Sequence, residues 1–92
     1  MERLIFRVHA IKHMFERNIS TDDVRQVLEN GEMVEEYPED KPFPSKLILG
    51  RIGSRPLHVV VAHDKATNEK IVITVYEPEP TMWEADFKRR KR

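Results

Sequence analysis

An imidazole and a phenol on neighbouring predicted strands are the side chains best suited to chemistry. His58 lies inside the apolar segment 55–62, and Tyr76 ends the apolar, β-branched segment 71–76. Successive side chains alternate between the faces of a strand, so antiparallel pairing can place both on one sheet face. Such a pair is either a reactive site or a buried hydrogen bond. The sequence leaves both interpretations open.

The chemistry that suits these groups is the metal-independent cleavage of RNA. Histidine exchanges protons near neutral pH, Arg55 can hold a phosphate, and Tyr76 can orient either partner. Attack of the RNA 2′-hydroxyl on the adjacent phosphate needs a base, an acid and a cation. The chain has no cysteine, so thiolate chemistry is excluded. His9 and His13 have a zinc-like spacing but no third ligand, and we expect neither a metal nor a cofactor.

A hairpin of the two apolar segments would fix the register of the site. If Asp64 faces Lys70, a regular ladder pairs His58 with Tyr76, and a bulge would shift that pairing. The same ladder pairs Val60 with Thr74 and Ala62 with Val72. Alternation then predicts that the helices cover the face formed by Leu57, Val59, Val61, Ile71, Ile73 and Val75.

Helical periodicity predicts a first helix from Val8 to about Asn18. Its apolar stripe is Ile11, Met14 and Phe15, which we expect to face the core. His9, His13 and Arg17 recur every four residues and form a second stripe on the opposite side. By spacing alone, this stripe is typical of a solvated helix face.

A second helix has clear start and stop signals. Ser20 can cap it while the Asp23 side chain reaches back to the Ser20 backbone. Asn30-Gly31 ends it with a residue that tolerates positive φ. The expected buried stripe consists of Val24, Val27 and Leu28.

The remaining segments complete an α+β fold in a single domain of residues 1–92. We expect a short strand at 4–6, the two helices, and then a three- to four-stranded antiparallel sheet with the helices on one face. Strands are predicted at 33–37 and 46–52, separated by a proline-rich loop. Thr81 and Glu84 have the spacing of a capping box, which predicts a short C-terminal helix through Phe87.

Charge is balanced overall but unevenly distributed. The net charge is zero, acidic residues crowd the segment 29–40, and a basic tail ends the chain. Such a tail is either a solvated end or an electrostatic footprint for RNA. The chain lacks a signal-peptide core and an apolar run of membrane-spanning length, so we expect a cytoplasmic protein without membrane contact. The candidate RNA-binding residues are Lys88, Arg89, Arg90, Lys91 and Arg92.

Segments along most of the chain resemble a family of small bacterial domains of unknown function, which in turn resembles RelE/ParE-like toxins. The segments are His9-Ala10, Met14, Glu16-Arg17, Ile19-Ser20, Val24, Val27-Leu28, Gly31, Glu36-Tyr37-Pro38, Pro44-Ser45, Leu49-Gly50, Arg55 to Val60, Thr74, Tyr76 and Trp83. The family commonly has arginine where this chain has His13.

The resemblance implies a RelE/ParE-like fold and a toxin that inhibits translation by cutting mRNA on the ribosome. It also implies a small antitoxin protein as partner. By analogy, the catalytic candidates are His58, Tyr76, Arg55, Arg17 and His9. The alternative hypothesis is a non-catalytic module of the same fold that binds protein or RNA.

Overall fold

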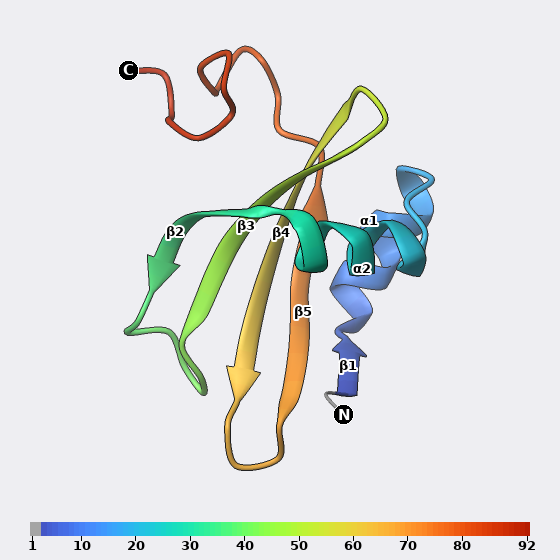
Figure 1. Ribbon diagram of the computed structural model, residues 1–92, viewed down its shortest axis with the longest axis vertical. Coiled ribbons are helices and arrows are strands. Elements are labelled where there is room, and N and C mark those ends of the chain that lie inside the picture. The colour runs from blue at the N-terminus through green and yellow to red at the C-terminus, as the bar shows by residue number, and fades with distance from the viewer. Residues whose placement is uncertain (1–2) are drawn as a thin grey trace.

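The computed structural model describes residues 3–92 and contains two helices and five strands (Figure 1). The predicted α+β class is confirmed, and the predicted bounds of both helices and the strands are close to those observed. In chain order the elements are β1 (Arg3–Phe6), α1 (Val8–Glu16), α2 (Thr21–Asn30), β2 (Glu32–Tyr37), β3 (Ser45–Ile52), β4 (Arg55–Asp64) and β5 (Glu69–Tyr76).

The strands form one mixed sheet in the order β1-β5-β4-β3-β2. The last four pair antiparallel, whereas β1 pairs parallel to β5. The expected antiparallel pairing is confirmed for β2 to β5, but the expected strand number is wrong, because β1 joins the sheet as a fifth strand parallel to β5. The physical reason is that both helices and three strands separate β1 from β5, and a long crossover allows parallel pairing.

Both helices pack on one face of the sheet, as predicted (Figure 1). Burial of apolar surface on this face supplies the main core of the domain. The buried residues that form this core are Ala10, Met14, Ile19, Val24, Val27, Leu57, Val59, Val61, Val72 and Val75.

The predicted apolar stripe of α1 is only partly correct. Met14 is buried, but Ile11 and Phe15 are exposed. α1 rests on β5 through the side that carries Ala10 and Met14, so the adjoining side of the helix faces solvent.

The N-terminus of α2 has the predicted capping box. The Ser20 hydroxyl accepts from the Asp23 backbone N–H, and the Asp23 carboxylate accepts from the Ser20 N–H, each at 3.0 Å. Gly31 follows the helix with φ −78° and ψ 177°, so its backbone conformation is extended. The expected use of positive φ at this position is wrong.

A bulge at Ile73 divides the β4–β5 ladder into two registers. His58 pairs with Tyr76 and Val60 with Thr74, as predicted, but Val61 pairs with Val72. Because Ile73 is an extra residue in β5, the β5 side chains between the bulge and the hairpin loop lie on the opposite sheet face from the one predicted. Val72 therefore lies in the helix-facing core, and the predicted placement of Ile71 and Ile73 there is wrong. The predicted pairs Ala62–Val72 and Asp64–Lys70 are likewise replaced, by Ala62–Ile71 and Asp64–Glu69.

The C-terminal segment, residues 77–92, is not helical, and the expected helix through Phe87 is wrong. It forms turns closed by an isolated bridge between Trp83 and Arg90. Phe87 has φ 58°, which interrupts a right-handed helix, and the Thr81 hydroxyl bonds to Glu79. Trp83 is buried against His58, so tertiary packing sets the path of this segment.

Candidate functional site

His58 is fully buried on the sheet face opposite the helices. It alternates with Leu57 and Val59, which lie in the helix-facing core. Its Nε2 is 2.8 Å from the Phe87 carbonyl oxygen, and its Nδ1 is 3.1 Å from the Tyr76 hydroxyl. A carbonyl only accepts, so Nε2–H donates to Phe87 and Nδ1 accepts from Tyr76. Both ring nitrogens of a neutral imidazole are thereby satisfied.

Aromatic packing holds the C-terminal segment on this face. The Trp83 ring meets His58 edge-on, with centroids 4.5 Å apart, and the Tyr76 ring does so at 5.2 Å. The Arg90 guanidinium lies 4.8 Å from the Trp83 ring centroid, and that of Arg51 lies 5.6 Å from Phe87. His58 thus joins β4 to both β5 and the C-terminal segment.

Burial sets the protonation state of this pair. Desolvation lowers the pKa of His58, the Phe87 carbonyl opposes that shift, and the positive charge of Arg90 adds to it. Burial also raises the pKa of Tyr76, an effect that Arg90 opposes and Glu35 reinforces. His58 is therefore neutral, and Tyr76 protonated, at neutral pH.

The lowered pKa of His58 predicts that the domain loses stability in mild acid. The unfolded chain, with a histidine pKa of about 6.5, binds a proton there more readily than the folded chain does. The free energy of unfolding should be fully retained above about pH 7 and fall as the pH drops towards the folded pKa. Denaturant unfolding at several pH values measures this slope. His58→Gln keeps a polar side chain but cannot titrate, and a slope identical to that of the wild type would contradict the prediction.

Arg55 is fully engaged in structural contacts. It forms an ion pair with Glu77, which follows β5, and donates to the Asn18 carbonyl at 3.2 Å and to that of Arg17. These bonds satisfy carbonyls at the C-terminal end of α1 and attach this end to the sheet. The Arg55 guanidinium therefore binds the backbone carbonyl of Arg17. It does not join the Arg17 side chain in a phosphate-binding site.

His9, His13 and Arg17 form the predicted stripe on α1. The two imidazole centroids are 4.5 Å apart, His9 and Arg17 are exposed, and His13 is half-buried. The helix lies on the face of the sheet opposite to His58. The predicted catalytic residues thus fall into two groups. One is the buried His58 with the half-buried Tyr76, and the other is the His9–Arg17 stripe with Arg55 at its end.

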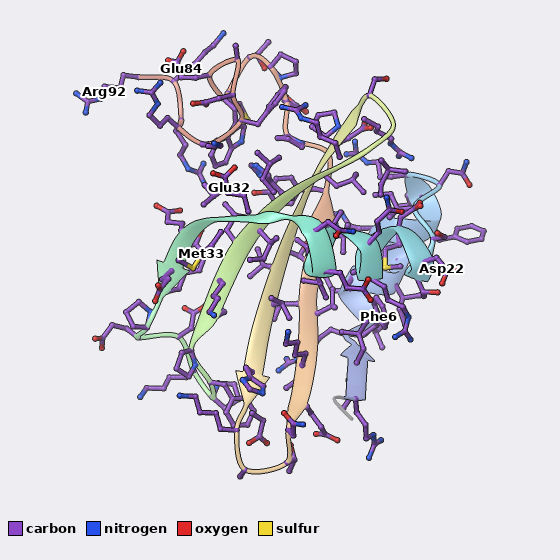
Figure 2. All side chains as sticks on the ribbon, in the orientation of Figure 1. Phe6, Asp22, Glu32, Met33, Glu84 and Arg92 are labelled. Carbon is purple, nitrogen blue, oxygen red and sulfur yellow. The ribbon has the colours of Figure 1, made fainter. Side chains whose placement is uncertain are left out.

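The basic segment 88–92 is folded against residues 82–84. The Lys91 N–H donates to the Met82 carbonyl at 2.9 Å, and the Glu84 N–H to the Arg89 carbonyl at 2.8 Å. Lys88 pairs with Glu32 at 2.9 Å. Figure 2 shows Glu84 and Arg92 close together at one end of the molecule. These contacts border a hollow of about 830 Å³ lined by Glu35, Trp83, Glu84, Lys88, Arg89, Arg90 and Arg92.

Two features escaped the sequence analysis. Arg51 joins the basic segment from β3, although nothing in the sequence relates it to Phe87. A second hollow of about 780 Å³ lies on the helix-facing side, where Leu28, Ile48 and Val61 meet the loop after β2. The prolines of that loop marked an irregular segment but not a cavity. Within residues 3–92 there is no cluster of three or more possible metal ligands, and no helix able to cross a membrane.

Comparison with known families identifies the chain. The profile of DUF4258, a domain of unknown function, matches residues 6–77. The chain belongs to the DUF4258 family. The DUF4258 match begins at Phe6, the last residue of β1, and ends at Glu77. It includes His9, Arg17, Arg55, His58 and Tyr76, whereas the basic segment lies outside it. No curated protein and no solved structure matches the chain significantly.

Proposed function

We propose that this DUF4258 domain binds RNA through a C-terminal basic surface, defined as Lys88–Arg92 together with Arg51. The observation that supports this proposal is the folding of consecutive cations around Trp83. Arg90 is exposed and its guanidinium rests on the buried indole, so its orientation is restricted. Cations held in place lose less side-chain entropy on binding phosphates than cations of a mobile chain end.

The surface suits a short single-stranded site more than a long duplex. Asp86 pairs with Arg89 and Glu32 with Lys88, so part of the positive charge is already neutralised. Trp83 is only 4% exposed and covered by Arg90, which leaves the guanidinium planes, rather than the indole, for stacking against bases. Affinity should therefore be modest, strongly salt-dependent and tolerant of sequence.

A combined Arg89→Gln, Arg90→Gln and Arg92→Gln variant should bind a labelled single-stranded RNA about tenfold more weakly at low salt. The slope of log affinity against log salt should shrink by about 0.7 for each lost phosphate contact. Fluorescence anisotropy measures both quantities, and circular dichroism checks the fold.

Lys12→Gln and Lys65→Gln are the matched controls, because both lysines are exposed and lie away from this surface. We expect their affinity and salt slope to equal those of the wild type. An equal loss in the controls, or no loss in the triple variant, would overturn the proposal.

Metal-independent RNA cleavage is a second candidate function, and the neighbouring imidazoles of the exposed His9 and the half-buried His13 support it. One neutral imidazole would take the proton of the RNA 2′-hydroxyl as that oxygen attacks the phosphorus. The other, protonated, would give its proton to the departing 5′-oxygen, while Arg17 holds the phosphate. The products are a 2′,3′-cyclic phosphate and a 5′-hydroxyl. This mechanism would fit a toxin that acts on ribosome-bound mRNA and is neutralised by an antitoxin, as the RelE-like resemblance implies.

Cleavage is expected to continue in EDTA and to fall by at least about a hundredfold in a His9→Ala, His13→Ala variant. Gel analysis of end-labelled RNA, with chemical identification of the termini, measures this loss. Induction of the wild type, but not of the variant, should also arrest growth. His63→Ala is the control, since this histidine lies near the C-terminal end of β4 and not on α1. Retained activity in the double variant would exclude the α1 stripe as the catalytic site.

A further inference from the structure

One side of α1 carries apolar side chains that remain largely exposed among residues 3–92. Val8 is 83% exposed, Ile11 51% and Phe15 87%. Met33 and Met82 are the other large hydrophobic residues exposed within residues 3–92, and neither lies on a helix. Exposed apolar residues that gather on one element mark an interaction site, whereas single ones need no explanation.

The spacing of the three residues matches that of a helix-docking surface. Positions 8, 11 and 15 follow the i, i+3, i+7 pattern of anchors on one helical face. The neighbouring side of α1, with Ala10 and Met14, is already buried against the sheet. Packing within the domain therefore orients the three exposed side chains outwards, and α1 lies at one side of the molecule (Figure 1). We call Val8, Ile11 and Phe15 the α1 apolar stripe.

We propose that the α1 apolar stripe binds an acidic amphipathic helix of a partner protein. Charge indicates the kind of partner, because Arg7 and Lys12 flank the stripe and both are exposed. Glu16 is the sole acidic side chain of α1. A partner helix with leucine-like anchors and flanking carboxylates would match both the apolar and the charged features. The inference rests on the burial and charge of α1 alone and is independent of RNA binding.

The same charges disfavour a second copy of this chain as the occupant. A two-fold dimer presents the same patch to itself, so the Arg7 and Lys12 side chains that flank the stripe in both copies would lie in one interface. Like charges brought together in an interface oppose association. A lipid surface is also a poor match, since the buried side of α1 leaves just three apolar side chains to insert. Stable membrane attachment requires a larger apolar area or a second anchor.

The test uses two labelled synthetic peptides of about 15 residues, each held helical by a side-chain cross-link, because an isolated helix of this length is marginal in water. Both carry leucines at the anchor spacing, and one has glutamates where the other has lysines. The acidic peptide should bind the full chain, and Phe15→Ser should weaken this binding by about tenfold or more. Lys12→Glu should weaken it as well. Met33→Ser removes an exposed apolar side chain elsewhere and should leave binding unchanged.

Three results would overturn the proposal. The first is failure of the acidic peptide to bind, or equal binding of both peptides. The second is a concentration-dependent dimer, seen by light scattering, that Phe15→Ser dissociates, because the occupant would then be a second copy. The third is binding to phosphatidylserine vesicles that Phe15→Ser abolishes, because the stripe would then be a membrane contact. Phe15 is 87% exposed, so its replacement should leave the fold intact.

Discussion

Replacement of His58 by alanine is expected to lower the free energy of unfolding by about 3 kcal/mol. The side chain is fully buried and makes hydrogen bonds to Phe87 and Tyr76. Its loss leaves a cavity beside Trp83 and removes the partner of a carbonyl and of a hydroxyl. Both consequences loosen the C-terminal segment from the sheet. Denaturant unfolding followed by circular dichroism and by Trp83 fluorescence measures the loss, and the chain has a single tryptophan.

Tyr76→Phe is the matched control for the hydrogen-bond part of this effect. It keeps the ring against His58 and removes only the hydroxyl, which should cost about 1 kcal/mol. The pair of variants also distinguishes the two interpretations of His58. A stable His58→Ala protein that has lost activity on RNA would identify a catalytic residue. A large loss of stability, with residual activity in proportion to the folded fraction, would identify a structural one.

The predicted pairing of His58 with Tyr76 is correct because two departures from the predicted ladder cancel. The ladder begins at Asp64–Glu69 instead of Asp64–Lys70, and the bulge at Ile73 restores the expected register beyond it. The bulge at Ile73 could not be predicted, since every residue from Ile71 to Val75 except Thr74 is apolar and suits either face. The register shift moves apolar side chains between the two faces, and at the loop end it replaces the predicted Asp64–Lys70 pair with Asp64–Glu69. The cost of each alternative depends on α1 and on β1, which pack on β5 from elsewhere in the chain.

The C-terminal segment shows the opposite case, in which a convincing local signal was overruled by packing. Thr81 and Glu84 have capping-box spacing, but a short isolated helix is marginal in water, whereas burial of the Trp83 ring against His58 stabilises the observed path. The same limit applies to α1. Periodicity identified its apolar residues, but it could not show that Met14 faces the sheet while Phe15 faces solvent.

The sequence indicates which residues could form the candidate site, but not that they lie in two separate parts of the structure. The sequence does indicate that His58 shares a sheet face with Tyr76 and that His9 shares a helix stripe with Arg17. Packing of the whole core determines which face of the sheet α1 covers. Because α1 covers the face opposite His58, the His58–Tyr76 pair and the His9–Arg17 stripe lie apart. The ion pair of Arg55 with Glu77, which removes Arg55 as a phosphate ligand, is not predictable from the sequence because the two residues are far apart along the chain.

Gly31→Ala is expected to destabilise the domain by about 3 kcal/mol or more, because the site has no room for a methyl group. A Cβ there would lie 2.7 Å from both the Leu49 carbonyl oxygen and the Ile48 Cγ2, and would overlap the Val27 carbonyl oxygen. Two of these atoms belong to the backbone, so relief requires α2 to move away from β3. Thermal unfolding monitored by circular dichroism measures the loss.

Gly53→Ala separates this steric effect from the loss of glycine's conformational freedom. Gly53 has φ +64°, but nothing lies within 4 Å of the position of its Cβ. Its replacement should therefore cost about 1 kcal/mol, the strain of a left-handed alanine. Gly31 is extended, and alanine is at no backbone disadvantage there. A larger loss at Gly31 than at Gly53 would show that contact between α2 and β3, and not turn geometry, requires glycine after α2. Equal losses would contradict the packing of these two elements as described.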